Sequence, residues 1–130
     1  MEFLHRTWAE IDLDALVRNF DIIKKEAEGA KVMAVVKADA YGHSVRIVAP
    51  ILEQHGADFF AVSNIEEAIT LRGCGVTRPI LILGYTPVSM AAQLYLNDIS
   101  QCVYSPEYAA ALSERACADG VKIKVHIKLD

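Results

Sequence analysis

The sequence predicts an α/β fold in which a parallel sheet alternates with helices, and two observations lead to this class. Short apolar segments of strand length alternate with longer segments whose apolar residues recur at helical spacing. The later apolar segments open near Phe59, Ile80, Gln101 and Lys122, at intervals of 21 residues. Such even alternation is typical of βαβ units, in which successive strands run parallel.

The elements are expected in a regular order along the chain. A helix over 12–28 has one apolar face, with Asp12 as its cap and Gly29 at its end. The valine-rich run 31–37 is typical of a strand that is covered on both faces. Ser105 and Gly120 are placed to begin and end a later helix over 106–119. The other expected elements are helix 44–54, strand 58–62, helix 64–72, strand 79–83, helix 89–96, strand 101–104 and strand 121–129.

Two architectures fit this order: an open sheet with helices on both faces, or an arc of a β/α barrel with helices on one face. A complete barrel typically needs about 250 residues. The chain has 130 residues and its last predicted element is an apolar strand. We therefore expect a partial TIM-type (β/α)8 barrel with a parallel sheet of about five strands, which forms the first part of a longer protein.

The composition excludes several classes of function. The formal net charge is -4, whereas nucleic-acid-binding domains usually carry a basic stripe. No apolar run approaches the roughly 20 residues that span a bilayer, and the first residues lack the order of a signal peptide. We expect a cytoplasmic protein without nucleic-acid or membrane partners. Cys74, Cys102 and Cys117 share no CxxC spacing, and no two histidines lie four apart, so neither a disulfide framework nor a metal site is predicted.

The stretch "AVVKADAYGHS", residues 34–44, carries the candidate chemistry. Lys37 follows an apolar strand, and in parallel β/α folds the working surface lies at the carboxyl ends of the strands. Apolar surroundings would favour the neutral, nucleophilic amine that forms an imine with an aldehyde. Tyr41 offers a hydroxyl, Gly42 allows a tight turn, and the first amides of the next helix could receive a phosphate. The alternative is a lysine that reaches from a strand end into water.

Four segments together resemble a known family. "TWAEIDLDALVRNF", "AVVKADAYGHS", "EEAITLRGCGVTRPILILG" and "VHIKLD" are similar, in this order, to motifs in the amino-terminal barrel of the alanine racemases, a fold type III pyridoxal-phosphate family that includes serine racemases. The resemblance implies that Lys37 holds pyridoxal 5'-phosphate covalently and acts as one of two bases that exchange the α-proton. It implies that Tyr41 hydrogen-bonds the cofactor phosphate, that Leu83 packs near the cofactor ring, and that Lys128 occupies a position that is often a carbamylated lysine.

The alternation over residues 122–129 is consistent with this role for Lys128. Lys122, Lys124, His126 and Lys128 alternate with apolar residues, so one face of the strand is polar. If that face lines a barrel mouth, Lys128 could reach the cofactor. The alternative is that the lysines protect an edge strand from unwanted pairing.

The chain also departs from the family pattern. Ser44 stands where glycine is usual after "YGH". In the family, the second base is a tyrosine from a carboxyl-terminal β domain of the partner in a head-to-tail dimer, and the arginine that faces the cofactor lies later in the barrel. We expect both regions to lie outside residues 1–130, and the segment "TWAEID" to join the sheet of that further domain.

The resemblance implies conversion of L-alanine to D-alanine, for cell-wall precursors, in the longer parent protein, whereas residues 1–130 alone are expected to lack turnover. Alternatives are serine racemisation, a basic amino-acid decarboxylase or cofactor carrier with the same barrel, and a non-enzymatic half-barrel module. An incomplete barrel leaves strand edges and an apolar face open. We therefore also predict a homodimer or a larger assembly that covers them.

Overall fold

Five strands within residues 7–129 form one parallel sheet. The computed structural model describes residues 7–129. Strands β1 (Met33–Val35), β2 (Phe59–Val62), β3 (Ile80–Ile82), β4 (Ile99–Val103) and β5 (Val125–Ile127) follow one another across the sheet in chain order. Each neighbouring pair is parallel. The predicted class, a parallel sheet of five strands that alternate with helices, is confirmed.

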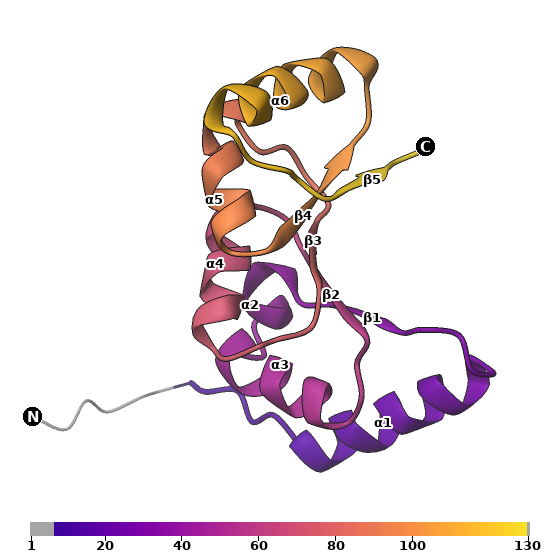
Figure 1. Ribbon diagram of the computed structural model, residues 1–130. Helices are drawn as coiled ribbons and strands as arrows, with labels where there is room; N and C mark the ends of the chain where they lie inside the picture. The colour runs from indigo at the N-terminus through magenta and orange to yellow at the C-terminus, as the bar shows by residue number, and fades with distance from the viewer. Residues whose placement is uncertain (1–6, 130) are drawn as a thin grey trace, which may run out of the picture.

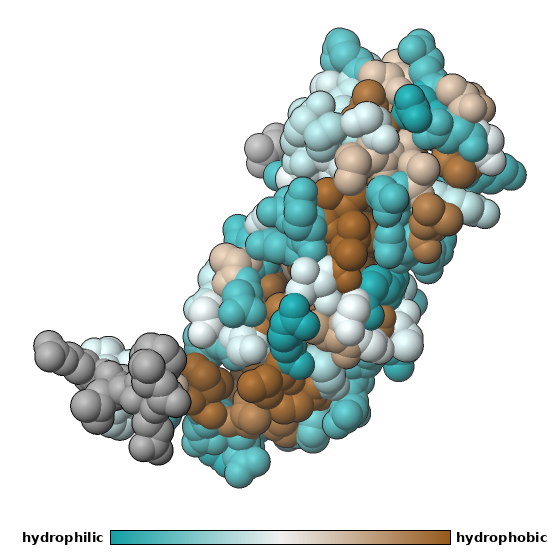
Figure 2. All heavy atoms as spheres, turned by 90° about the vertical axis from the view of Figure 1, so that its left-hand side faces the viewer, coloured by the Kyte–Doolittle hydropathy of each residue, from teal (hydrophilic) through white to brown (hydrophobic). Residues whose placement is uncertain are grey.

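The helices gather along the sheet as an arc of a barrel requires. They are α1 (Leu13–Glu26), α2 (Lys37–Tyr41), α3 (Val45–Gln54), α4 (Ile65–Gly73), the 3-10 helix η1 (Val88–Met90), α5 (Ala91–Leu96) and α6 (Pro106–Asp119). In Figure 1, α3, α4, α5 and α6 follow one another on one side of the strands, and the opposite face of the sheet is left open. Figure 2 shows the helical side, on which apolar patches are separated by polar residues. None of the helices over residues 7–129 is long and apolar enough to cross a membrane.

Side-chain caps explain where three helices begin. Asp12 accepts a hydrogen bond from the Ala15 amide at 2.8 Å, and Ser105 accepts one from the Tyr108 amide at 3.1 Å. The predicted caps at both positions are confirmed. Asn64 caps α4 in the same way. Gly120, with φ of 67°, ends α6, so the predicted range 106–119 matches the observed helix.

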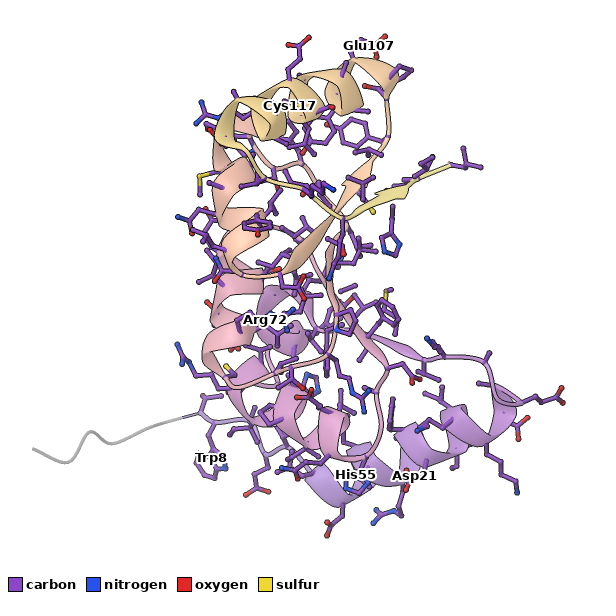
Figure 3. The ribbon with its side chains drawn as sticks, viewed as in Figure 1. Trp8, Asp21, His55, Arg72, Glu107 and Cys117 are labelled. Carbon is purple, nitrogen blue, oxygen red and sulfur yellow. The ribbon has the colours of Figure 1, made fainter. Side chains whose placement is uncertain are left out.

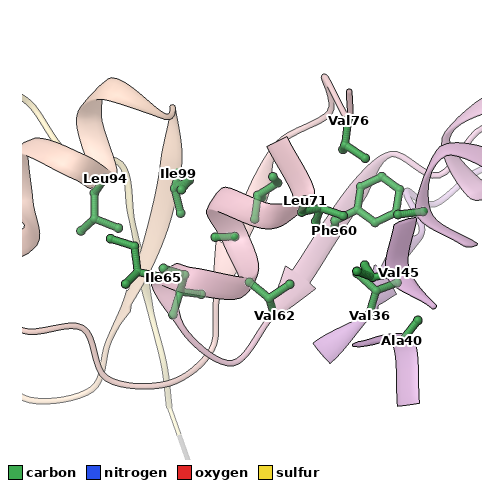
Figure 4. Packing of buried hydrophobic residues seen from close by; sticks show 14 of the residues in the cluster. Val36, Ala40, Val45, Phe60, Val62, Ile65, Leu71, Val76, Leu94 and Ile99 are labelled. Carbon is green, nitrogen blue, oxygen red and sulfur yellow. The ribbon is translucent and has the colours of Figure 1, made fainter. Parts of the chain in front are cut away.

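The hydrophobic core lies between the sheet and the helices. Phe60, Val62, Ile80 and Ile82 alternate along β2 and β3, are fully buried, and pack against Leu71 of α4 (Figure 4). The residues between them face the other side of the sheet, because successive side chains of a strand alternate. The register places Val35, Ala61, Leu81 and Ser100 together on that open face.

Two predictions about the strands are wrong. The run 31–37 is not covered on both faces, since Met33 and Val35 are 37% and 41% exposed. β1 is an edge strand, and these residues point to the open face. The even spacing also fails at the end of the chain, because β4 already begins at Ile99 and β5 only at Val125.

Candidate active site

The chain makes an unusual left-handed turn immediately after Lys37. Ala38, Asp39, Ala40 and Tyr41 have φ angles of 50°, 54°, 53° and 55°. For residues other than glycine this conformation costs roughly 1–2 kcal/mol each, because Cβ approaches the following carbonyl oxygen. Four such residues in succession therefore concentrate backbone strain beside the candidate lysine. Nothing in the hydrophobic pattern predicted this turn.

The polar residues of the turn hold its own backbone. The Asp39 carboxylate accepts a hydrogen bond from the Val45 amide, the first residue of α3, at 2.7 Å. The Nδ1 atom of His43 lies 3.0 Å from the Ala40 carbonyl and 3.2 Å from the Tyr41 carbonyl. Because a carbonyl oxygen can only accept, Nδ1 carries the proton in these contacts. Asp39 and His43 are thus occupied with maintaining the turn.

The contact between Asp39 and Val45 bears on the expected phosphate site at the start of α3. The Asp39 carboxylate already accepts the hydrogen of the Val45 amide, the first of the helix. An anion at this one amide would have to displace Asp39.

Two polar groups of the turn are left free. Lys37 is half-buried, and within residues 7–129 its amine makes no hydrogen bond or ion pair. Tyr41 is 60% exposed, and its hydroxyl has no hydrogen-bond partner in the same part of the chain. A primary amine and a phenol thus belong to the same turn at the carboxyl end of β1, and the polar side chains of Asp39 and His43 fix its backbone.

Leu83 lies at the carboxyl end of β3, nearer the middle of the sheet. Its amide donates to the Val62 carbonyl at 2.9 Å, so it extends the pairing of β3 with β2. Leu83 is half-buried, and strand alternation places it on the open face after Leu81. The predicted apolar contact for a cofactor ring thus lies, like Lys37, at the carboxyl ends of the strands. We call this end of the sheet the rim.

Lys128 lies at the other edge of the sheet. Its amide donates to the Val103 carbonyl at 2.8 Å, and the register continues Lys128 beside Tyr104 on the open face. Burial raises the pKa of the nearby Cys102 thiol, and the charge of Lys128 partly offsets this effect. Lys37 and Lys128 lie on the two edge strands, β1 and β5, of the sheet. Lys37 and Tyr41 belong to one turn, whereas Lys128 comes from the opposite edge strand.

A cluster of tyrosines on the same rim was not predicted. The ring centroid of Tyr108 lies 5.4 Å from that of Tyr85 and 5.2 Å from that of Tyr104, with which it is stacked. The Tyr108 hydroxyl donates to the Thr86 carbonyl at 2.7 Å. Burial raises the pKa of Tyr108. The spacing of Tyr104 and Tyr108 across a helix start was the available signal, but the loop that carries Tyr85 is distant in sequence.

The hollows and polar clusters elsewhere do not compete with this rim as a site. One hollow of about 430 Å³ lies between α6, the end of β4 and the segment that leads into β5, and its lining is mainly apolar. Over residues 7–129, no group of three or more histidine, cysteine, aspartate or glutamate side chains is placed to hold a metal ion. The candidate site is therefore the rim that carries Lys37.

Comparison with known families supports the resemblance noted in the sequence. The family model described as alanine racemase, N-terminal domain, matches residues 11–130. The chain belongs to this family. Among curated relatives of the family, the alanine racemase of Clostridium perfringens is 48% identical over 123 residues, which cover 95% of this chain and 32% of that protein. Alanine racemase 1 of Caldanaerobacter subterraneus is 45% identical over 125 residues, with the same coverage.

Solved structures of the family have the same fold. The alanine racemase of Clostridium difficile 630 matches with a TM-score of 0.89 and 44% identity, over 99% of this chain and 34% of that chain. The alanine racemase of Bacillus anthracis with bound L-Ala-P matches with a TM-score of 0.87 and 36% identity, over 98% of this chain and 33% of that one. The predicted partial barrel is thereby confirmed. The chain spans about a third of the length of its relatives.

Proposed function

We propose that, in a protein of the length of its relatives, this chain is the amino-terminal part of the barrel of a pyridoxal-phosphate-dependent amino-acid racemase, with alanine as substrate. The observation that carries the proposal is the position of Lys37. It combines a half-buried amine, which is unpaired within residues 7–129, with the carboxyl end of a barrel strand. This is where β/α barrels place their reactive groups.

The residues of the rim fit the cofactor. A covalent bond to an aldehyde needs a primary amine that is not held in an ion pair, and Lys37 makes no ion pair within the described residues. The exposed hydroxyl of Tyr41 can donate to a phosphate oxygen. Leu83 presents an apolar side chain to the open face, against which a ring can pack. When bound, the cofactor supplies the electron sink that weakens the Cα–H bond of an amino acid.

Lys37 contributes proton transfer on one face of the substrate. Its amine can take a proton from Cα or return one, provided that the amine is within hydrogen-bond distance of that carbon. Racemisation also requires a second base on the opposite face of the substrate, and the family resemblance implies that this base lies outside residues 1–130. We therefore propose that residues 1–130 alone do not turn over substrate. The second base is expected from the part of the family's length that this chain does not span.

The choice of alanine is supported by the names of the relatives. The curated relatives that match over 95% of this chain are alanine racemases. A histidine racemase of Leuconostoc mesenteroides also matches, with a TM-score of 0.80 and 31% identity over 86% of this chain. The same portion of the barrel thus occurs in racemases for different side chains. We infer that residues outside this chain select the substrate, which keeps serine as an alternative.

We also propose that the protein forms a homodimer or a larger assembly and supplies D-alanine for cell-wall precursors in the cytoplasm. The support for assembly is the exposure of apolar side chains at both edges of the sheet. Val35 is 41% exposed on β1, Ile127 is 79% exposed on β5, and Leu129 is 90% exposed. Burial of such groups favours association. A monomeric mass by light scattering at micromolar concentration would contradict this part of the proposal.

The experiment that tests the proposed function is reductive trapping. The chain and its Lys37→Ala variant are incubated with pyridoxal phosphate, reduced with borohydride, and digested, and adducts are mapped by mass spectrometry. An adduct concentrated at Lys37 and lost in the variant is expected. Adducts scattered over surface lysines would overturn the assignment. In a protein of the length of the relatives, exchange of alanine enantiomers without release of carbon dioxide would separate racemase from decarboxylase.

A further inference from the structure

Glu67, on the first turn of α4, joins two loops of the rim. One carboxylate oxygen accepts a hydrogen bond from the Ala38 amide at 2.8 Å. The other accepts one from the Ser63 amide, also at 2.8 Å. The Glu67 amide in turn donates to the Asn64 side chain at 2.9 Å, which fixes the start of the helix that carries the carboxylate. Both oxygens of one side chain are thus used to connect the loops after β1 and β2.

The Ala38 amide is a sensitive point because it directly follows Lys37. Ala38 is the first residue of the left-handed turn, with φ of 50°. The contacts of Asp39 and His43 act within the turn or between the turn and α3. Glu67 instead reaches the turn from another β/α unit. Its hydrogen bond fixes the peptide plane between Lys37 and Ala38, and this plane sets the direction in which the Lys37 side chain leaves the backbone.

The contacts made by Glu67 continue into the neighbouring loops of the rim. The Ser63 carbonyl lies so close to Gly84 that a Cβ atom at Gly84 would be 2.5 Å from the Ser63 oxygen. The Gly84 carbonyl accepts a hydrogen bond at 2.7 Å from the side chain of Gln101, which is fully buried in β4. Consecutive contacts therefore run from the turn after Lys37, through Glu67, to the loops after β2 and β3 and to β4. Glu67 joins this framework to the peptide bond that follows Lys37.

We propose that Glu67 is a positioning residue for Lys37. It acts through the Ala38 amide and not on the substrate or the cofactor. This inference rests on the proposed role of Lys37 as the cofactor lysine. It adds that the loops after β2 and β3 fix the direction of the Lys37 amine through the Glu67 carboxylate. The same carboxylate helps to stabilise the strained turn. Preorganisation of this kind is what a covalent cofactor site requires of its supporting residues.

The test compares the reactivity of Lys37 with that of another lysine in the same molecule. Wild type and Glu67→Gln are treated with pyridoxal phosphate and borohydride, and the adduct at Lys37 is divided by the adduct at Lys25, which is exposed on α1. The amide of the new glutamine cannot accept a hydrogen bond with its nitrogen, so one of the two contacts is lost. We expect the ratio to fall by about five- to tenfold. Hydrogen exchange of the Ala38 amide should accelerate in parallel.

Two matched variants separate positioning from general loss of charge or stability. Glu66→Gln removes the same charge from the neighbouring, exposed position on α4. Glu53→Gln removes a carboxylate that accepts hydrogen bonds from Thr77 and Arg78, just before β3 and so at the amino ends of the strands. Both variants should retain the wild-type ratio. Circular dichroism checks that each variant is folded, and Glu67→Asp, which is too short to reach both amides, replaces Glu67→Gln if the latter unfolds.

The outcomes distinguish this inference from the proposed function. A wild-type chain without a selective adduct at Lys37 would overturn the proposed function and the inference that rests on it. A selective adduct that persists at the wild-type ratio in folded Glu67→Gln or Glu67→Asp would overturn the role of Glu67 alone. An Ala38 amide that exchanges equally fast in wild type and variant would do the same. A lower ratio in the Glu67 variants, with both controls unchanged, would support the proposal.

Discussion

The two ends of the parallel strands use their charged side chains in different ways. The amino edge is the end of the sheet at which the strands begin, and the carboxyl edge, which carries Lys37, is the end at which they finish. At the amino edge, the Arg72 guanidinium (Figure 3) donates to the carbonyls of Val76, Arg78, Asn97 and Asp98 at 2.7–2.9 Å. At the carboxyl edge, Glu67, Asp39 and His43 hold the backbone, but the amine of Lys37 and the hydroxyl of Tyr41 are free of partners within residues 7–129.

This difference indicates a division of labour within the same sheet. The amino edge uses ionic groups to join the segments that precede the strands, which stabilises the fold. At the carboxyl edge the backbone is strained, and polar side chains stabilise the strained turn. The amine of Lys37 and the hydroxyl of Tyr41 therefore stay available. This agrees with the general tendency of β/α barrels to separate stability from chemistry at opposite ends of the strands.

Arg72→Ala should lower the free energy of unfolding more than any of the other substitutions. A small loss would contradict the structural role given to the amino edge. The change leaves four carbonyl groups without their donor, and we expect the free energy of unfolding to fall by about 2–4 kcal/mol. Urea denaturation followed by circular dichroism measures it. Arg115→Ala is the control, because among residues 7–129 Arg115 pairs only with Asp119, on the surface of α6, and its removal should cost under about 0.5 kcal/mol. Equal losses in the two variants would contradict the structural role of the amino edge.

Gly84→Ala tests the close packing of the carboxyl edge. The added methyl group would meet the Ser63 carbonyl at 2.5 Å, so we expect a loss of about 1–3 kcal/mol. Gly73→Ala is the matched change, since no atom lies within 4 Å of a Cβ atom there. It should be neutral or slightly stabilising, because alanine favours the helix in which Gly73 lies. Similar melting temperatures for the two variants would show that the loops at this edge can separate.

Ala38→Gly tests the strain itself through the sign of its effect. Glycine adopts a φ of 50° without a Cβ clash, so this change should stabilise the chain by about 0.5–1 kcal/mol. Ala110→Gly, at an exposed position inside α6, should destabilise it by a similar amount. Destabilisation by both glycines in thermal unfolding would mean that the left-handed turn is not strained.

The smallest effect is a pH dependence at the amino edge. Burial raises the pKa of Glu53, but hydrogen bonds from Thr77 and from the Arg78 amide lower it more, so the net pKa lies below its ordinary value of 4.5. Since the folded pKa is depressed, the contribution of Glu53 to stability is present above pH 4.5 and is lost as the pH falls through the folded pKa. Solvent screening keeps it under about 1 kcal/mol. Unfolding curves of wild type and Glu53→Gln should therefore converge on acidification, and a constant gap from pH 7 to pH 3 would rule this out.

The elements that were predicted well are those in which local signals agree. The range 106–119 of α6 followed from Ser105, Pro106 and Gly120, whose effects are confined to the backbone around them. The run 31–37 was identified as a strand, but its burial was misjudged because a continuous apolar run indicates a strand and does not show that β1 lies at an edge.

The residues of the candidate site also fall into those that the sequence pattern identifies and those that it does not. Lys37 and Tyr41 could be chosen from the motif because the amine, the phenol and the strand end lie within a few residues. Glu67 lies in another β/α unit, and the pattern Asn64-x-x-Glu67 indicates only a helix cap. Its second contact, with Ala38, bridges 29 positions in the sequence. Pattern reasoning has no access to such a pair.

The sequence by itself determined the order of strands and helices, the caps, and the lysine at the end of the first strand, because these depend on local backbone preferences and on the periodicity of apolar residues. Only the tertiary structure decided that β1 is exposed, that the turn after Lys37 is left-handed, and that Glu67 and Asp39 hold it. A left-handed turn of four non-glycine residues is unfavourable locally. It forms because contacts between segments distant in sequence compensate for its strain.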